Sequence, residues 1–408
     1  MSSAEKQKNI YFIDQTSEFD HHMVFNASML KILCKIFPQA KIYHCGLPSN
    51  IESVKTLLSP EEQDRITPEF IPHKKVSGGI LKKGLNYLRK ERYRYHHFKQ
   101  VLSRTTENDW IILSITTFTS FLWFKRLKRK YNTPTIAVLH GDVDYLYKSE
   151  TKFQKVNAWV HKKIFKTKAP NFFYLTLNKI EKKFLVQDGY LKNEEVFEIE
   201  HPFLSLEETE PRKTPNTPLT IGHIGSMEVA RKNSHYLFKI AKNCKDLISN
   251  NKVLFKSVGL LNDSIDPYVN DYVELMVGNR NAEGPLKYLT RKDYEEGLDS
   301  LDYAIFFYPE DEYIFRASGA VADFIAKCKP IICLKHPIFE YMFENAGNIG
   351  FMCNSLEDIQ TKIHEIASKQ CDLNSIYREQ VNNLKDYQKK FSIQHVAEDL
   401  NQQIIKFR

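Results

Sequence analysis

Several classes of protein are excluded by what the sequence lacks. The longest apolar runs, such as residues 110–113 and 121–124, are far shorter than the roughly 20 residues that span a bilayer. The polar start MSSAEKQKN leads into no apolar signal segment, so we expect a cytoplasmic chain. Fifteen glycines and sixteen prolines among 408 residues are too few for a fibrous or low-complexity protein. A globular protein fits, since 42% of the residues are apolar and can form a core.

Patterns typical of disulfide scaffolds and metal sites are also missing. The seven cysteines are an odd number, and no two of them form a CxxC pair. The adjacent histidine pairs at 21–22 and 96–97 lack the i, i+4 spacing and the acidic companion of a zinc-hydrolase helix. We therefore expect free thiols in a reducing compartment and no structural metal.

Positive charge is abundant and unevenly distributed. The net charge is +8, and residues 73–131 alone contain fifteen Lys and Arg against three acidic residues. Aromatic residues are interleaved with these cations, as at Tyr93 and Trp123. Such a surface attracts phosphate in nucleic acid, in anionic lipid or in a pyrophosphate-bearing molecule. A solvated helix face in a lysine-rich protein explains the pattern equally well.

Short apolar runs alternate with helical periods along the chain, which predicts an α/β fold with parallel sheets. The predicted strands are 9–14, 41–44, 110–114, 135–139, 173–177, 196–199, 219–224, 252–258, 273–277, 303–307 and 330–334. The predicted helices are 23–37, 80–102, 116–130, 179–187, 234–243, 291–298, 318–326 and 356–369, followed by a mostly helical tail over 373–407.

The polar, proline-containing segment 207–218 divides this pattern into two series. We therefore predict two doubly wound domains, 1–206 and 219–390, joined by this linker. A C-terminal helix within 391–408 is expected to pack back on the first domain. Because ligands of such sheets bind outside the carboxyl ends of the strands, we expect an active cleft between the domains.

The second domain carries two features that suit a phosphate. Ser318 and Gly319 open a predicted helix, whose first amides and positive dipole end favour an anion, and Asp323 on the same helix can accept hydrogen bonds from a ribose. An ordinary helix cap explains this first feature equally simply. The predicted strand 219–224 runs into Gly225, and Arg231 and Lys232 follow before the next helix. Two such features at strand ends of one domain favour a bound diphosphate.

The stretches LTIGHIGSMEVARK (219–232) and YPEDEYIFRASGAVADFIAKCKPIICL (308–334) resemble nucleotide-sugar-dependent glycosyltransferases of the GT-B architecture, in particular the group 1, family 4-like set. In that signature an acidic residue lies seven positions before a proline that opens an apolar strand, a spacing that Asp323 and Pro330 keep. The resemblance implies two Rossmann-like domains that face each other across a cleft, and a nucleoside diphosphate sugar as donor.

The resemblance also implies roles for residues of the second domain. Arg231 and Lys232 would hold the diphosphate from one side, and the Ser318 and Gly319 amides from the other, while Asp323 would bind the ribose. The candidate substrate-binding residues are Gly225, Arg231, Lys232, Leu289, Thr290, Glu310, Glu312, Arg316, Ser318, Gly319 and Asp323. Leu289 and Thr290, with Tyr288, occupy the place where the family holds the nucleobase.

Two positions depart from the family pattern. The first acidic residue of its two-glutamate signature is replaced by Phe315, with Glu310 and Glu312 nearby but out of register. The glycine before its Lys-Pro step is Cys328 here. The donor sugar and the stereochemical course are therefore left open.

The first domain is expected to bind the acceptor and to supply catalytic groups. His140 ends a predicted strand, and Asp14 and His21 lie at or after the end of the first strand. Each can hydrogen-bond a reacting sugar or act as a base, although polar loop residues are common at strand ends. If the reaction inverts configuration, the base would be one of Asp14, Asp20, His21, His140 or Asp142. His201 we interpret as structural and lining the cleft.

Together these observations predict a glycosyltransferase that moves a sugar from a nucleotide donor to a glycan or lipid-pyrophosphate-linked acceptor. Polysaccharide or surface-glycan assembly fits this activity, with no cofactor or metal required and with peripheral contact to an anionic membrane on its inner face. One alternative is a non-catalytic nucleic-acid-binding protein, although no recognised nucleic-acid motif accompanies the basic stretch. Another is a different GT-B enzyme, such as a nucleotide-sugar epimerase or a phosphorylase.

Overall fold

The computed structural model describes residues 8–72, 80–147, 151–204, 210–278, 289–310, 312–315, 318–368 and 372–407. The chain divides into two compact units. The N-terminal unit combines residues 1–205 with residues 391–408, and the C-terminal unit comprises residues 206–390. Among the described helices, none combines the length and apolar character needed to cross a bilayer.

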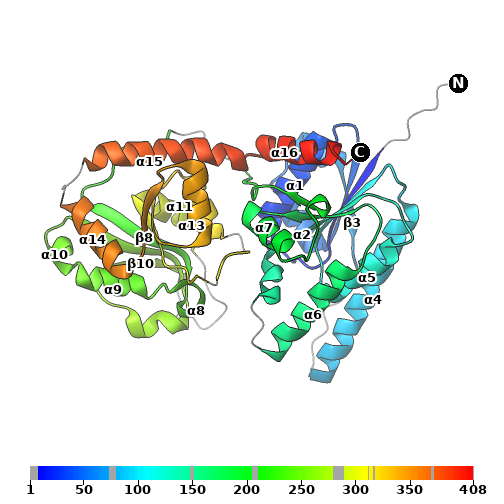
Figure 1. Cartoon of the computed structure of the whole chain (residues 1–408), viewed down its shortest axis with the longest axis horizontal. Helices are drawn as coiled ribbons and strands as arrows, with labels where there is room; N and C mark the ends of the chain where they lie inside the picture. The colour runs from blue at the N-terminus through cyan, green and yellow to red at the C-terminus, as the bar shows by residue number, and fades with distance from the viewer. Residues whose placement is uncertain are drawn as a thin grey trace. The chain divides into compact units, whose positions relative to one another are not determined.

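The N-terminal unit is built on a parallel sheet, with β3 labelled in Figure 1. The strand order is β3-β2-β1-β4-β5-β6-β7. Its strands are β1 (Asn9–Asp14), β2 (Lys41–Gly46), β3 (Ile66–Phe70), β4 (Trp110–Ile115), β5 (Thr135–Val138), β6 (Phe172–Thr176) and β7 (Val196–Glu198). Its helices are α1 (Met23–Ile36), α2 (Pro48–Lys55), α3 (Pro60–Arg65), α4 (Ile80–Arg104), α5 (Phe118–Lys128), η1 (Gly141–Leu146), α6 (Lys152–Lys166), α7 (Lys179–Gln187), η2 (Asn193–Glu195) and α16 (Ile393–Ile405).

The last helix of the chain belongs to the core of this N-terminal unit. α16 packs against α1, and its apolar face joins the buried cluster formed by the sheet and α1. Val396, Leu400 and Ile404 are almost completely buried there. The main-chain amide of Phe203 also donates to the Phe391 carbonyl, and the two rings stack with centroids 4.7 Å apart. The end of the chain is thus held to the end of the N-terminal series of elements by apolar burial.

The C-terminal unit repeats the same design, with the strand order β10-β9-β8-β11-β12-β13. Its strands are β8 (Leu219–Met227), β9 (Val253–Leu261), β10 (Val273–Val277), β11 (Tyr303–Phe306), β12 (Ile331–Leu334) and β13 (Gly350–Cys353), all parallel. Its helices are α8 (Val229–Lys232), α9 (Tyr236–Asn243), α10 (Lys245–Ser249), η3 (Asp263–Tyr268), α11 (Arg291–Ser300), α12 (Gly319–Ala326), α13 (Pro337–Ala346), α14 (Leu356–Ala367) and α15 (Leu373–Gln388), with η4 (Lys389–Phe391) after α15. The predicted fold class, α/β with two Rossmann-like doubly wound sheets, is confirmed.

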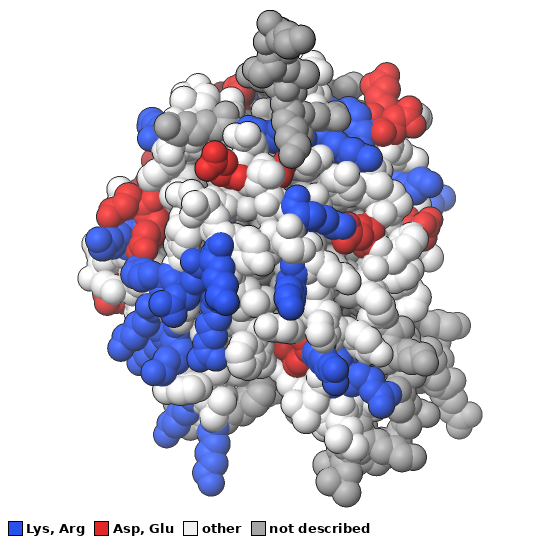
Figure 2. Space-filling model, turned by 90° about the vertical axis from the view of Figure 1, so that its right-hand side faces the viewer, with Lys and Arg blue, Asp and Glu red and all other residues white. Residues whose placement is uncertain are grey.

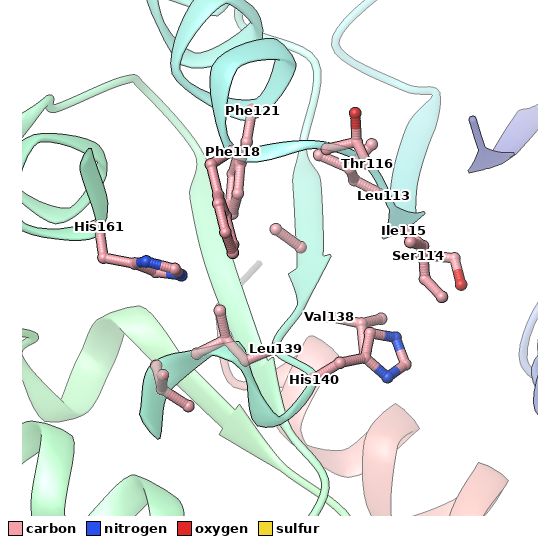
Figure 3. A pocket seen from close by; sticks show the side chains of 12 residues that line it. Leu113, Ser114, Ile115, Thr116, Phe118, Phe121, Val138, Leu139, His140 and His161 are labelled. Atoms are coloured by element: carbon pink, nitrogen blue, oxygen red, sulfur yellow. The ribbon is translucent and has the colours of Figure 1, made fainter. Parts of the chain in front are cut away.

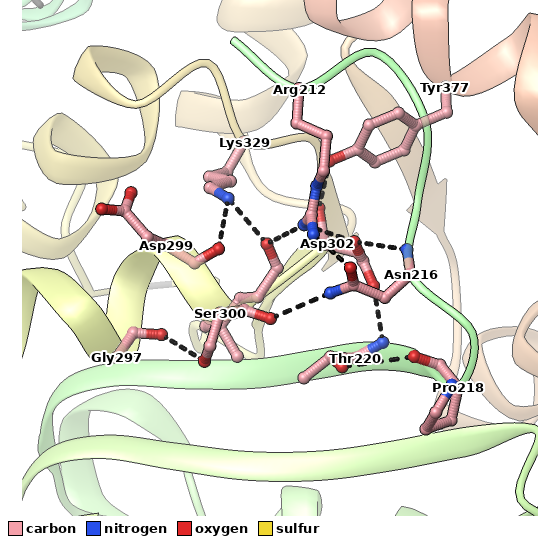
Figure 4. Close-up of polar contacts among 11 residues, drawn as sticks. Arg212, Asn216, Pro218, Thr220, Gly297, Asp299, Ser300, Asp302, Lys329 and Tyr377 are labelled. Atoms are coloured by element: carbon pink, nitrogen blue, oxygen red, sulfur yellow. Dashed lines mark hydrogen bonds and ion pairs between the residues drawn. The ribbon is translucent and has the colours of Figure 1, made fainter.

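A buried carboxylate ties the start of the C-terminal unit to its sheet (Figure 4). Asp302, which is fully buried, accepts from an Arg212 guanidinium nitrogen at 2.6 Å and from the amides of Asn216 at 3.0 Å and Thr220 at 2.8 Å. Burial raises the pKa of Asp302, whereas the two amides and Arg212 lower it. On the same turn, the Lys329 ammonium donates to the carbonyls of Asp299 and Leu301. This network fixes where the segment before β8 enters the sheet.

We expect Asp302→Ala to be among the most destabilising substitutions in the C-terminal unit. The change leaves the buried Thr220 amide, the partly buried Asn216 amide and the partly exposed Arg212 guanidinium without their acceptor, which should cost roughly 3 kcal/mol in the free energy of unfolding. Denaturant unfolding measures the loss. Glu210→Ala, which breaks the exposed pair with Lys385, is the control and should leave the unfolding midpoint unchanged. A midpoint for Asp302→Ala equal to that of the control would show that the network does not hold the unit together.

The sequence patterns predict most elements to within a few residues and miss a few. β3 was not predicted because ITPEF contains Pro68, which lacks an amide donor and suits only an edge strand. β13 has only four residues and begins at Gly350, which has φ +154°. α6 carries a helical period among many lysines, and α13 begins at Pro337, yet neither was predicted.

Candidate functional site

The topology of the C-terminal sheet brings its two phosphate-compatible segments together. β8 and β11 are neighbours at the centre of the sheet, although four α-helices, the short helix η3 and two strands separate them among the described residues of the chain. The strand order reverses between these two strands, and the crevice outside the carboxyl ends of such a pair is where doubly wound sheets bind ligands. Gly225 lies near the carboxyl end of β8, Lys232 ends the short helix α8 that follows it, and Ser318 follows β11. The sequence placed both segments at strand ends; only the pairing of β8 with β11 makes them adjacent.

Lys232 is buried, unlike the neighbouring cation Arg231. Its side chain is only 8% exposed, and its ammonium donates to the Ser226 carbonyl at 2.9 Å. Burial lowers the pKa of Lys232, while the Glu228 carboxylate raises it. Burial has removed most of the water that would solvate this ammonium. A phosphate beside the ammonium would take the place of that water, so the Lys232 charge would favour phosphate binding strongly.

The amino end of α12 lies against the same spot. Ser318 caps the helix, since its hydroxyl accepts from the Val321 amide at 3.3 Å. Gly225 has φ +82°, and a Cβ built on it would lie 3.6 Å from Ala320 Cβ and 3.9 Å from Lys232 Nζ. A Cβ built on Gly319 would meet nothing within 4 Å. A bare glycine backbone, a buried ammonium and a helix N-terminus therefore converge, which is the arrangement that binds phosphate.

Two tyrosines that were not predicted from the sequence, Tyr308 and Tyr313, lie beside Ser318 and Lys232. Tyr308 shares a 2.7 Å hydrogen bond with the Ser318 hydroxyl, and its ring stacks on Tyr313 with centroids 4.3 Å apart. Tyr313 lies 5.9 Å from the Lys232 ammonium and has φ +58°, in the left-handed region. A β-preferring residue gives no sequence signal for such a conformation, so only the structure reveals Tyr313 as part of the site.

Asp323 and the start of α11 form a second, adjoining group. The Tyr294 hydroxyl donates to Asp323 Oδ2 at 2.6 Å, which ties α11 to α12. Thr290 caps α11, because its hydroxyl oxygen accepts from the Asp293 amide at 3.1 Å, and half-buried Leu289 precedes it. Tyr294 is therefore a further residue beside the carboxylate that we assigned to the ribose.

The remaining predicted residues of this unit lie less centrally. Arg231 is exposed, with its Nε 3.5 Å from the Glu228 carboxylate. Glu310 is exposed, and the Glu312 main-chain carbonyl accepts from His336 Nε2 at 2.7 Å. Phe315, at the family's acidic position, is buried. Arg316 and Tyr288 lie outside the described residues.

Cys328, the second position that departs from the family pattern, has an unusual backbone conformation. Cys328 has φ +50°, a region that favours glycine. It is also 3% exposed, so this chain combines a left-handed conformation with a buried thiol at the end of α12. The neighbouring Lys329 has a structural role through its two carbonyl acceptors.

In the N-terminal unit, His140 lies at the carboxyl end of β5 among aromatic rings. Its ring centroid is 5.0 Å from that of Phe25 and 5.2 Å from that of His22, and its Nε2 is buried without a hydrogen-bond partner. Burial lowers the pKa of His140 to about 3. The ring is therefore neutral near pH 7 and suits a hydrogen bond to a ligand better than a full proton transfer.

A small cavity lies beside His140 (Figure 3). The ends of β4 and β5 and the start of α5 line it, with Phe118 and Phe121 on one side. Its volume is about 40 Å³, which holds a few water molecules but no sugar ring.

The two other predicted catalytic residues differ in accessibility. Asp14 is 1% exposed, and its carboxylate accepts from the amides of Thr16 and Ser17 and from the Asn26 side chain. With its oxygens occupied in this way, Asp14 serves to hold the loop after β1 and is poorly placed to act as a base. His21 is exposed, and its ring packs edge-on against His22 at 4.1 Å.

One group of potential metal ligands occurs among the described residues, in the N-terminal unit: Cys45, Glu69 and His97. Their ligand atoms lie within 4.8 Å of one another. Glu69 already pairs with Arg104, and His97 Nδ1 lies 3.4 Å from the Gln15 side-chain amide nitrogen. That nitrogen makes Nδ1 the acceptor, which leaves the proton on Nε2, 3.4 Å from Glu69. Within this group the Glu69 carboxylate is thus already engaged by Arg104.

Gly319→Val tests whether a ligand approaches the α12 amides. Because the position is exposed and open, the free energy of unfolding should change by less than about 1 kcal/mol. The added methyl groups would cover the amides, so the affinity for whichever nucleoside diphosphate binds the wild type, measured by calorimetry, should fall at least tenfold, by a loss of about 1.4 kcal/mol. Gly84→Val, at an equally open helix position of the N-terminal unit, is the control. Unchanged affinity in Gly319→Val would move the diphosphate away from α12.

Comparison with known proteins gives a clear structural result. No family profile and no curated protein matches the sequence. Anabaena Alr3699/HepE, solved in complex with UDP, superimposes with a TM-score of 0.64 at 13% identity and covers 98% of this chain and 100% of its own. A TarM structure gives a TM-score of 0.64 at 12% identity, with 98% and 99% covered.

A UDP-N-acetylglucosamine 2-epimerase, so described for Listeria monocytogenes, gives a lower TM-score of 0.51 at 10% identity, with 95% and 94% covered. At these identities the likeness concerns the fold. Over nearly its whole length, the chain has the GT-B fold, with two Rossmann-like domains, that it shares with glycosyltransferases of known structure.

Proposed function

We propose that the protein is a glycosyltransferase that uses a nucleoside diphosphate sugar as donor. The observation that carries this proposal is the convergence of the Lys232 ammonium, the Gly225 backbone and the amino end of α12. Similarity to a fold that binds UDP in HepE supports it. These groups would stabilise the departing diphosphate by charge and by preorganised amides, without a required metal or cofactor.

We assign further roles on the same basis. Asp323 would bind the ribose, with Tyr294 orienting its carboxylate. Leu289 and Thr290 would lie near the nucleobase, and Arg231 would add positive charge at the mouth of the site. In the N-terminal unit, His140 is our candidate for the residue that contacts the reacting sugar, as a neutral ring.

The acceptor we propose is a glycan or a lipid-pyrophosphate-linked glycan, in polysaccharide or surface-glycan synthesis. The basic and aromatic character of residues 73–131 supports a cytoplasmic protein that binds peripherally to an anionic membrane. The site does not support the nucleic-acid alternative, because a nucleic-acid-binding protein would not need a site built for a nucleoside diphosphate.

A nucleotide screen tests the proposal. Thermal unfolding with UDP, GDP, ADP, CMP or TDP should show stabilisation by at least one of them, by about 2.7 kcal/mol at a hundredfold excess over Kd. Turnover of the matching nucleotide sugar should require an added acceptor. Conversion of the donor without an acceptor would favour an epimerase, to which the structural likeness is weaker. Stabilisation by RNA or DNA alone would favour the nucleic-acid-binding alternative.

A further inference from the structure

Three helices of the N-terminal unit form a strongly basic layer. α5 packs against both α4 and α6. Their sequences contain sixteen Lys and Arg but a single acidic residue, Glu91. Glu91 is 7% exposed and is fully engaged, since its carboxylate accepts from Arg94, Thr117 and Ser120. No carboxylate of these helices is therefore left on their outer surface to neutralise the cations.

Most of these cations are exposed on one side of the unit, whereas Arg94, Lys125 and Lys128 are buried. Figure 2 shows this side, with Lys and Arg side chains gathered in its lower part, where Figure 1 places α4, α5 and α6. On α6 every Lys is exposed, and α4 and α5 add further exposed cations. The exposed cations of the described helical residues include Arg89, Arg92, Lys99, Arg126, Lys152, Lys155, Lys162, Lys163 and Lys166.

Large apolar side chains are exposed among these cations. Leu85 and Leu88 on α4 are 68% and 65% exposed, and Val156 and Trp159 on α6 are 58% and 57% exposed. The spacing of three residues in each pair puts its members on one face of their helix. Trp123 of α5 is also exposed. We call these five side chains, with the cations above, the basic apolar face.

Aromatic rings on this face already pair with cations. The Arg126 guanidinium lies 5.0 Å from the Trp123 ring centre, and the Lys163 ammonium lies 5.6 Å from that of Trp159. Indole rings beside Lys and Arg are typical of the headgroup level of a bilayer, where the ring sits between water and acyl chains.

We propose that the basic apolar face docks this protein onto an anionic lipid bilayer. The inference extends the proposed function, which draws its acceptor from a membrane, by naming the surface that makes the contact. Negatively charged headgroups would neutralise the cations of all three helices, and Leu85, Leu88, Val156 and Trp159 would enter the boundary between headgroups and acyl chains. Nucleic acid offers phosphates for the cations but no apolar layer for the two leucines and the valine, so a bilayer fits the face better.

Vesicle sedimentation without any nucleotide tests the proposal. The full-length protein should sediment with vesicles of phosphatidylglycerol mixed with phosphatidylcholine, and not with phosphatidylcholine alone. Binding should weaken as salt is raised, because screening shortens the reach of the cations. Emission from the exposed tryptophans should shift to shorter wavelength on binding, and Trp159→Phe should bind with a smaller shift.

Two double variants separate the apolar and the charged parts of the face. Leu88→Glu with Trp159→Glu, and Lys155→Glu with Lys162→Glu, should each lower the partition coefficient about tenfold or more. The matched control is Lys239→Glu with Lys242→Glu, two exposed lysines on α9 of the C-terminal unit, which should bind vesicles like the wild type. All these positions are exposed, so thermal unfolding should stay close to that of the wild type.

The outcomes are distinct from those of the donor test. Nucleotide-induced stabilisation should be the same in all these variants, because no changed residue belongs to the diphosphate site. Failure of the wild type to bind anionic vesicles would overturn the docking proposal, as would equal binding by the variants of the face and the control. Binding of single-stranded RNA in place of vesicles, lost in the same variants, would also overturn it and assign the face to nucleic acid.

Discussion

Lys232→Met should lower kcat/KM for the nucleotide sugar by about a hundredfold or more. The methionine keeps most of the aliphatic length of the lysine but removes the ammonium. That ammonium lies 2.9 Å from the Ser226 carbonyl and 3.9 Å from the position that a Cβ on Gly225 would take. In the wild type, a diphosphate would give this desolvated charge its counter-ion. Steady-state kinetics and calorimetry with the nucleoside diphosphate that stabilises the wild type measure the loss, and the Kd for that nucleotide should rise with it.

Lys232→Met should change the stability of the protein far less than its activity. Because burial already disfavours the Lys232 ammonium, its removal should leave the unfolding temperature of the free protein within a few degrees of the wild type. Arg231→Met is the matched comparison, since Arg231 is the adjacent cation but is exposed and close to Glu228. We expect a smaller loss there. If Lys232→Met retains both nucleotide binding and turnover, the diphosphate does not bind at this ammonium.

Acidification should unfold the protein well before its carboxylates are all protonated. Burial lowers the pKa values of four histidines, to about 4 for His44 and His201 and to about 3 for His140 and His223. In the unfolded chain a histidine has a pKa near 6.5, so between these limits the unfolded state binds more protons. The stabilisation from neutral burial is complete above about pH 6.5 and is lost as the pH falls towards the folded-state values. By pH 5 the loss should be about 2 kcal/mol for each histidine.

A single substitution tests this pH dependence. His44 is 2% exposed, and its Nε2 lacks a partner, so leucine can replace the ring at small cost near neutral pH. The slope of the free energy of unfolding against pH between 6.5 and 5 should then be shallower by up to one proton, about 1.4 kcal/mol per pH unit. The same substitution at exposed His96 controls for the change of side chain. An unaltered slope in His44→Leu would mean that this ring does not stay neutral in the folded state.

Much of the secondary structure could be predicted from the sequence, because local patterns determine it. The burial of β1 on both faces demands the continuous apolar run over Ile10–Ile13, and the predicted strand over 9–14 has the bounds of β1. The helix over 179–187 is predicted with its observed bounds because Asn178 caps it, with the side chain accepting from the Glu181 amide. β3 was missed because an edge strand needs only one partner and tolerates Pro68.

The roles of site residues were harder to predict from local pattern. Arg231 and Lys232 are adjacent in the chain and look alike in sequence, yet one is exposed and the other is buried beside Gly225. Asp14 resembles a catalytic carboxylate at a strand end, but the amides of its own loop and Asn26 occupy its oxygens. Accessibility and hydrogen-bond saturation depend on the whole fold, so a single sequence does not reveal them.

The sequence by itself determined the alternation of strands and helices, the break at 207–218 and the presence of a glycine turn, a cation pair and a capped helix. Each of these follows from interactions between residues a few positions apart. Only the tertiary structure decided that β8 lies beside β11, so that Lys232 and the start of α12 share one point, and that Tyr313 joins them. Such neighbours are set by long-range strand pairing and side-chain packing, and these depend on the folding of the entire C-terminal unit.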